Sequence, residues 1–264
     1  LAAAAEAGAA GHEVLLLERS ARIGGQAALA AAAPARAELA EALTRNYERL
    51  LAAGDVELRA GVETRPEEVS ELAPDAVVVA TGARPFRPYD LELEGVEELQ
   101  AWDVLTGARP LGRRVVVVDW GGDPAGLDAA ELLARRGNDV TLAVASVAVG
   151  EALHQYARAL YLQRLYRADV RVAHHLELVG AERGAVLFRN AFAPEVETEL
   201  AADVVVLALG RVPVDGLAPG LRALGLRVEE AGDCLTPRSL EEAILEGTLA
   251  TRRIQATAVT SPSR

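Results

Sequence analysis

The sequence predicts an α/β protein with two copies of a strand–helix–strand unit whose strands are parallel. One observation is a run of four apolar residues that ends at Glu18, as expected for a buried strand that reaches the edge of a parallel sheet. The other is a repeat, because residues 1–18 align without a gap with residues 127–144 and Gly11 then matches Gly137. Two related units along one chain predict two related domains.

The second copy of the unit is complete, whereas the first is not. Residues 115–118 are its first strand, residues 121–126 a glycine-rich turn and residues 127–136 its helix. By the repeat, the matching strand and turn of the first copy would precede Leu1, so we expect this chain, which contains no Met, to be the inside of a longer protein. Since such a turn binds pyrophosphate, we expect residues 1–264 alone to hold a dinucleotide poorly.

The other elements of the first half follow from local signals. Gly11 ends an Ala-rich helix, Pro34 interrupts a low-complexity run, and Glu67 and Glu68 favour the first turn of a helix. Helices are therefore predicted over residues 1–10, 38–51 and 66–72, and strands over residues 14–18, 56–58 and 75–82 with a short piece around Val62. Residues 95–107 are a predicted connector.

The second half is predicted from apolar runs and the repeat. Strands are expected over residues 140–144, 170–172, 185–188 and 204–209, a return strand over residues 229–233, helices over residues 152–165 and 240–254, and a tail over residues 257–264. In the helix over residues 152–165, the amphipathic pattern predicts that Tyr156 and Leu160 point inward.

Charge and composition exclude several classes of function. The formal net charge of −12 argues against nucleic acid or an anionic membrane surface as a partner. All basic residues besides His are Arg, so Schiff-base lysine and P-loop lysine chemistry are excluded. No apolar run is long enough to span a bilayer, and residues 1–10 lack the basic segment of a signal peptide.

A single cysteine, Cys234, limits redox and metal chemistry within this chain. A disulfide framework, a Cys-rich zinc or iron–sulfur site and a dithiol pair each need more than one. We therefore expect a reducing, cytoplasmic setting. Cys234 is interpreted as a packed small side chain rather than a nucleophile, because no His is near it in sequence.

Residues suited to a nucleotide follow the first predicted strands. Glu18 can accept hydrogen bonds from an adenosine ribose, with a solvated acid as the alternative. Gly24 and Gly25 let backbone approach a ligand, with an ordinary loop as the alternative. Val62 can offer backbone bonds to an adenine.

Four short motifs stand out along the chain: Glu18-Arg19, Gly24-Gly25-Gln26, Ala80-Thr81-Gly82-Ala83-Arg84-Pro85 and Gly232-Asp233-Cys234. Together they resemble those of the flavoproteins with two dinucleotide-binding domains. More narrowly, the chain resembles the carboxyl-terminal part of the old-yellow-enzyme-related group that includes 2,4-dienoyl-CoA reductase, trimethylamine dehydrogenase and N-methylproline demethylase. The stretch over residues 102–107 and the segment from Pro237 to Ile254 suit that group.

The resemblance implies two Rossmann-like domains, the second inserted into the first. Residues 1–110 and 214–256 would form a domain that carries FAD, or only ADP, and residues 111–213 a domain like those that bind NAD(P). A barrel with FMN and an iron–sulfur cluster precedes these domains in the family, so the implied partners are that barrel, an electron-transfer partner and further copies of the protein.

The resemblance also assigns roles to residues of the first domain. Gln26 would line the approach of the cofactor, and as a neutral residue where disulfide reductases begin a cysteine pair it removes a dithiol mechanism. Thr81 and Gly82 stand where open α/β sheets bind ligands, which is compatible with a tight turn between domains. Asp233 would bond the ribitol or a pyrophosphate-bound water, with a turn-forming Asp as the alternative.

The second nucleotide site is predicted to be degraded. Asp123 replaces the middle glycine of the Gly-x-Gly-x-x-Gly pattern and would crowd a pyrophosphate. Val144 occupies the position that Glu18 has in the first copy, so no acid is placed for an NAD ribose. We therefore expect this domain not to bind a nicotinamide cofactor productively.

Three hypotheses about function follow. The chain is the FAD- or ADP-binding module of an oxidoreductase for an N-methylated amine or an enoyl substrate, with the catalytic residues outside residues 1–264. Alternatively, both nucleotide sites are vestigial and the domains are structural, or the chain is an NAD(P)H-dependent flavin reductase fragment. A metal site at His174, His175 and Glu177 is not expected, because adjacent strand residues point to opposite faces.

Overall fold

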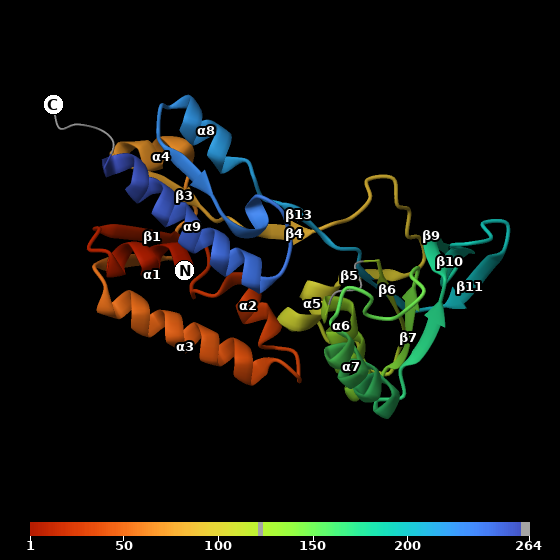
Figure 1. The fold of residues 1–264 in the computed structure, drawn as a ribbon. Coiled ribbons are helices and arrows are strands. Elements are labelled where there is room, and N and C mark those ends of the chain that lie inside the picture. The colour runs from red at the N-terminus through yellow and green to blue at the C-terminus, as the bar shows by residue number, and fades with distance from the viewer. Residues whose placement is uncertain (121–123, 260–264) are drawn as a thin grey trace. The chain divides into compact units, whose positions relative to one another are not determined.

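A computed structural model describes residues 1–120 and 124–259, with side chains described as far as residue 256 (Figure 1). Contacts divide the chain into two compact units, and unit 2 interrupts unit 1 along the sequence. Unit 1 comprises Leu1–Ala31, Glu38–Arg84 and Arg211–Arg264, and unit 2 comprises Ala32–Ala37 and Pro85–Gly210. Each unit mixes helices with parallel strands, which confirms the predicted α/β class.

Unit 1 is built on two pairs of parallel strands. β1 (Val14–Glu18) pairs with β2 (Val56–Ala60), and β3 (Val77–Val79) pairs with β14 (Val228–Glu230). Its other elements are α1 (Ala2–Ala9), α2 (Gly25–Ala30), α3 (Ala37–Ala53), α4 (Pro66–Glu71), α8 (Leu217–Ala223), the 3₁₀ turn η1 (Gly232–Cys234) and α9 (Leu240–Val259).

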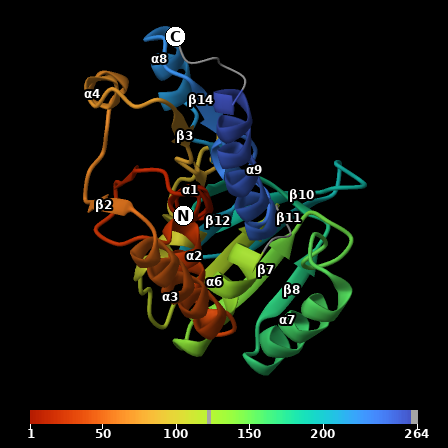
Figure 2. The same cartoon turned by 60° about the vertical axis from the view of Figure 1, so that its left-hand side comes forward.

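The first and last helices of unit 1 pack closely together (Figure 2). A Cβ on Gly247 of α9 would lie 3.2 Å from the Cβ of Ala2, so a side chain at this position would crowd α1. Thr251 Oγ1 also donates to the carbonyl of Ala3 at 3.1 Å. Small residues in both helices therefore bring the end of the chain back onto its beginning.

Unit 2 contains a five-stranded parallel sheet with the strand order β5-β12-β6-β7-β8. A separate antiparallel sheet has the order β11-β10-β9. The strands are β5 (Glu97–Gln100), β6 (Arg114–Asp119), β7 (Asp139–Val144), β8 (Arg171–His174), β9 (Leu176–Glu182), β10 (Ala185–Asn190), β11 (Glu197–Ala201) and β12 (Val204–Ala208). Its helices are α5 (Ala101–Thr106), α6 (Pro124–Arg135) and α7 (Gln155–Arg167).

Alternation along β6 divides the interior of unit 2 into two cores. Val115 and Val117 pack with residues of α6, such as Leu127, whereas Val116 and Val118 pack in the cluster of the antiparallel sheet. Successive side chains of a strand point to opposite faces, so a fully apolar strand predicts burial on both. Figure 1 shows the three helices on one face of the five-stranded sheet and β9–β11 on the other.

The predicted connector over residues 95–107 is wrong, because it contains β5 and α5. β5 is an edge strand with two glutamates, so its sequence lacks the apolar run of a buried strand. In α5 the Asp103 carboxylate accepts from the backbone N of Gln100 at 2.8 Å, while Val104 and Leu105 are buried. Strands β9 and β11 were also not predicted.

The predicted orientation of the helix over residues 152–165 is wrong. Tyr156 and Leu160 of α7 are 72% and 60% exposed, whereas Tyr161 and Leu165 are buried. The inward face is set by α6, against which Arg164 pairs with Glu131 at 2.9 Å. Two further limits differ from expectation: α6 begins at Pro124, within the predicted turn, and α9 continues to Val259, into the predicted tail.

The unit limits also lie elsewhere than the expected domain boundaries at residues 110/111 and 213/214. Residues 85–110 belong to unit 2, because β5 joins its sheet beside β12. The expectation about Asp123 falls outside the described residues. Within residues 1–120 and 124–259, no helix combines the length and apolar character needed to cross a membrane.

Two acids one turn apart in α6, Asp128 and Glu131, have no exposed surface. Asp128 forms an ion pair with Arg36, and Glu131 forms pairs with Arg135 and Arg164. Burial raises the pKa of Asp128 to about 6, although the Arg36 guanidinium lowers it. The folded protein therefore favours the protonated form of Asp128 more than the unfolded chain does.

This raised pKa predicts how stability changes with pH. Between about pH 4 and 6 the folded state binds more protons at Asp128 than the unfolded state, so this contribution falls as pH rises and is fully lost above about pH 6. The unfolding free energy of the wild type relative to Asp128→Asn should therefore fall by about 2 kcal/mol between about pH 4 and 7.5. Denaturant titrations of both proteins measure this difference.

Asp203→Asn is the control for that titration. Hydrogen bonds from Arg114 lower the pKa of Asp203 to about 2, so its stabilising contribution is lost only as pH falls below about 4. The difference in unfolding free energy between the wild type and Asp203→Asn should therefore stay constant from about pH 4.5 to 7.5. If the difference in unfolding free energy between the wild type and Asp128→Asn is also independent of pH, burial does not raise the pKa of Asp128 and the interpretation is wrong.

Candidate functional site

The residues predicted to bind a nucleotide lie at the carboxyl ends of the strands of unit 1. Glu18 is the last residue of β1, and Val62 follows the end of β2 by two residues. Residues 80–82 directly follow β3, and Gly232 and Asp233 follow β14. Because each pair of strands is parallel, its two carboxyl ends share one edge, which is where open α/β sheets bind ligands.

The Glu18 carboxylate is held at the end of β1 by local backbone. Its Oε1 accepts a hydrogen bond from the backbone N of Ser20 at 2.7 Å. The backbone carbonyl of Glu18 accepts one from the backbone N of Val62 at 2.9 Å. Glu18 is half-buried, and its carboxylate is an acceptor suited to the hydroxyls of a ribose. The exposed guanidinium of Arg19 lies 3.7 Å from the carboxylate of Glu63.

Gly24 and Gly25 form the turn into α2 and both require a glycine conformation. Their φ angles are +118° and +48°. A Cβ added to Gly25 would meet no atom within 4 Å, so packing alone does not explain why this residue is Gly. The open space beside its backbone fits the predicted approach of a ligand.

Gln26, Asp233 and Arg211 form one hydrogen-bonded group. Gln26 Nε2 donates to Asp233 Oδ2 at 2.8 Å. Arg211 Nη1 donates to the same Oδ2 at 2.5 Å and to Gln26 Oε1 at 2.8 Å. Asp233 is only 8% exposed, so Arg211 supplies the opposite charge that a buried carboxylate needs.

The loop before α9 completes the surroundings of Asp233. Arg238 donates its backbone N to Asp233 Oδ1 at 3.0 Å, and its carbonyl accepts from Arg211 Nη2 at 2.9 Å. Glu246 accepts from the backbone N of Gly232 at 2.8 Å and pairs with the Arg238 side chain. The Asp233 carboxylate is therefore held by hydrogen bonds from Gln26, Arg211 and the backbone of Arg238.

Arg211, Arg238 and Glu246 were not among the predicted site residues. Arg211 was visible in sequence as the residue after Gly210, at the end of an apolar strand. Its partners were not visible, because Gln26 lies 185 positions and Asp233 22 positions away. Pairing over such distances leaves no periodic signal in the sequence.

Thr81 and Gly82 serve the connection between strands. Thr81 Oγ1 donates to the carbonyl of Val214 at 2.5 Å, and Val214 N donates to the carbonyl of Gly82 at 2.9 Å. These contacts lie beside the paired strands β4 (Ala83–Pro85) and β13 (Arg211–Pro213). A Cβ on Gly82 would lie 3.5 Å from Gln26 Nε2, so this turn also borders the Gln26 group.

The corresponding strand end in unit 2 carries different chemistry. Val144 is the last residue of β7 and is 1% exposed, so an apolar side chain stands where β1 has a carboxylate. His174 ends β8, and His175 follows with a φ of +63°; their ring centroids are 5.9 Å apart. Among the described residues, no group of three or more His, Cys, Asp or Glu side chains could hold a metal ion.

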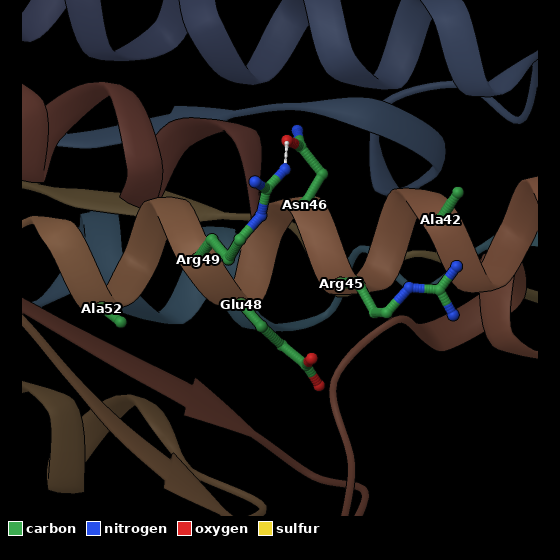
Figure 3. Close-up of a pocket in the computed structure, with 6 residues that line it drawn as sticks. All are labelled: Ala42, Arg45, Asn46, Glu48, Arg49 and Ala52. Atoms are coloured by element: carbon green, nitrogen blue, oxygen red, sulfur yellow. Dashed lines mark hydrogen bonds between the residues drawn. The ribbon is translucent and has the colours of Figure 1, made fainter.

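A hollow along one helix of unit 1 does not coincide with these residues (Figure 3). It is lined entirely from α3, and Arg49 Nη2 donates there to Asn46 Oδ1 at 3.1 Å. None of the predicted site residues lines it. The lining residues are Ala42, Arg45, Asn46, Glu48, Arg49 and Ala52.

Comparison with known proteins gives a family for almost the whole chain. Residues 1–244 match the family described as pyridine nucleotide-disulphide oxidoreductase. The fold is similar to that of histamine dehydrogenase from Rhizobium sp. 4-9, with a TM-score of 0.88 and 20% identity, over 99% of this chain and 42% of that one.

Two curated relatives are similar in sequence. The N,N-dimethylglycine/sarcosine dehydrogenase of Chromohalobacter salexigens is 32% identical over 275 residues, which cover 89% of this chain and 40% of the relative. The NADH oxidase of Thermoanaerobacter brockii is 30% identical over 252 residues, which cover 93% of this chain and 38% of the relative. The chain thus spans well under half the length of either relative.

The burial of Cys234 predicts its reactivity. The side chain is 1% exposed, and its Sγ donates to the carbonyls of Val79 at 3.2 Å and Ala231 at 3.3 Å. A disulfide reagent such as DTNB should therefore release no thiolate from the native protein and one equivalent per chain after denaturation. Rapid release from the native protein would contradict the interpretation of Cys234 as a packed side chain.

Proposed function

The chain belongs to the pyridine nucleotide-disulphide oxidoreductase family, and from this premise we propose that unit 1 holds FAD, or only its ADP part, with the adenosine ribose on Glu18. The carboxylate of Glu18 at the end of β1 carries this proposal. It combines an acceptor at a strand end with a glycine turn at Gly24 and Gly25 that is open beside the backbone of Gly25. A carboxylate acceptor in this place fits the hydroxyl donors of an adenosine ribose.

The residues of this chain bind and orient the cofactor. When bound, FAD supplies two-electron redox chemistry. Glu18 would hold the ribose, the backbone of Gly25 would let the cofactor approach, and Asp233 would accept hydrogen bonds from the sugar alcohol or from a water on the diphosphate. A dithiol relay has no place in this chain, since Gln26 is neutral and Cys234 is the single cysteine.

The larger enzyme is proposed to be of the old-yellow-enzyme-related type. The similarity to a dehydrogenase named for N,N-dimethylglycine and sarcosine favours an N-methylated amine over an enoyl substrate. A preceding barrel would carry FMN, an iron–sulfur cluster and the catalytic residues, and a redox protein or a further copy of the chain would accept electrons. The relatives have room for such a barrel, because this chain covers 40% and 38% of their lengths.

The strand pairs of unit 1 are consistent with a further strand. Among the described residues, β1 pairs only with β2 and β3 only with β14, while Leu17 of β1 packs in the same cluster as Val77 and Val79 of β3. We propose that a parallel apolar strand, the first strand of the first repeat, pairs with the open edges of β1 and β3. It would bring a glycine turn like that expected from the repeat to the carboxyl edge beside Glu18.

A flavin reductase driven by a nicotinamide cofactor is the second candidate. The name of the relative from Thermoanaerobacter brockii, NADH oxidase, favours it. The buried Val144 at the end of β7 opposes it, because an NAD ribose needs an acid there. We therefore propose that unit 2 is a structural domain with a degraded nucleotide site.

Glu18→Gln tests the adenosine site. Replacing the carboxylate weakens its charge-assisted hydrogen bonds to the ribose, so affinity for both FAD and ADP should fall by about tenfold or more. Calorimetric titration of the complete natural protein, freed of flavin, with each ligand measures this loss of affinity. Glu57→Gln in exposed β2 is the control and should bind as the wild type does. Equal affinities for all three proteins would rule out Glu18 as the ribose ligand.

Anaerobic mixing with NADH and NADPH tests the second candidate. Since β7 ends in a buried Val144, and residues 144–150 contain neither an acid for an NAD ribose nor an Arg for the 2′-phosphate of NADP, FAD bound to unit 1 should keep its visible absorbance on mixing. Dithionite serves as the positive control because it reduces the flavin without a binding site. Rapid bleaching by either nicotinamide would establish the flavin reductase instead.

A further inference from the structure

We propose that Arg211 is a positioning residue of the FAD site, which holds the Asp233 carboxylate and fixes the direction of the Gln26 amide. The proposal rests on the proposed function of unit 1 and assigns a role to a residue outside the predicted site. Its basis is the arrangement of three side chains from β13, η1 and α2, all within unit 1.

The chemistry of Arg211 determines which way the Gln26 amide points. A guanidinium has donors and no acceptor, so the Gln26 atom that it contacts at 2.8 Å must be the amide oxygen. The amide nitrogen then faces Asp233 Oδ2, which can only accept, at 2.8 Å. Without Arg211, the amide of Gln26 loses the partner that distinguishes its two ends.

Arg211 also sets the charge beside the proposed cofactor. Asp233 is nearly buried, and a lone carboxylate there would repel a diphosphate and be poorly solvated. The pair with Arg211 is neutral overall, so the carboxylate keeps its role as an acceptor without that repulsion. Arg238 N bonds Oδ1 while Arg211 and Gln26 bond Oδ2, which leaves the orientation of the carboxylate determined.

Arginine is suited to this task because one guanidinium reaches three acceptors at once. Nη1 donates hydrogen bonds to Asp233 and Gln26, and Nη2 donates one to the carbonyl of Arg238 at 2.9 Å. A lysine would supply the charge from a single point without the planar fork. Arg211→Lys should therefore restore only part of what Arg211→Gln removes.

The experiment uses the complete natural protein, freed of FAD and titrated with it, with melting temperature recorded for each variant. Arg211→Gln should weaken FAD binding by about tenfold to 100-fold and shift the visible absorption bands of the bound flavin. Arg211→Lys should lie between Arg211→Gln and the wild type. Arg45→Gln removes the same charge from exposed α3 (Figure 3) and should match the wild type.

A double variant separates positioning from a purely structural role. Arg211→Gln with Asp233→Asn replaces the ion pair by two neutral groups, so no buried charge is left unpaired and the melting temperature should recover. If Arg211 acts through the Asp233 carboxylate, the double variant binds FAD no more weakly than Asp233→Asn alone, because the group that Arg211 positions is already absent. If the losses of FAD affinity from the two single variants add in the double variant, Arg211 acts independently of Asp233 and the proposal is overturned.

The remaining outcomes distinguish this proposal from the one on which it rests. Wild-type protein that binds neither FAD nor ADP overturns both. Wild-type binding of FAD with an unchanged affinity and flavin spectrum in Arg211→Gln overturns only the role of Arg211. Should Arg211→Gln not fold, the comparison of Arg211→Lys with the wild type, and of the double variant with Asp233→Asn, decides by the same criteria.

Discussion

Parallel strand pairing is the constraint on which the candidate site of unit 1 depends. Two parallel strands end at the same edge, so residues that follow them come together wherever they lie in the sequence. Residues after β3 and β14 meet in this way, as do those after β1 and β2. The hydrogen bond between Gln26 and Asp233 then joins a helix early in the chain to the 3₁₀ turn that follows β14, 207 positions later. The chain leaves unit 1 after Arg84 and returns at Arg211, and both β4 and β13 lie beside this group.

Three buried acids, one in unit 1 and two in unit 2, are paired by arginine. Asp233 pairs with Arg211, Asp128 with Arg36, and Glu131 with Arg164. A guanidinium is more weakly hydrated than an ammonium and keeps its charge when it is partly buried, so it suits these positions better than lysine would. In a chain without Lys, pairs of this kind combine charge neutralisation with a fixed direction of hydrogen bonding.

Features encoded locally could be predicted from the sequence, whereas features set by distant contacts could not. The run ending at Glu18 and the valines of β6 are short apolar segments of the kind typical of buried strands, and both form strands in the structure. The edge strand β5 has charged residues, and its identity depends on β12 more than 100 positions away. The inward face of α7 depends in the same way on α6, which is why Tyr156 and Leu160 were placed wrongly. In the candidate site, Glu18 ends a strand and Asp233 follows one, so both could be found, but the role of Arg211 emerges only from its contacts.

The most direct test of this account is a crystal structure of the protein with ADP or FAD bound. The account predicts that the ribose hydroxyls of the adenosine contact the carboxylate of Glu18 at the end of β1, and that Arg211 still donates to Asp233 and Gln26. A nucleotide bound at the end of β7 in unit 2, with Glu18 contacting no ligand, would contradict it.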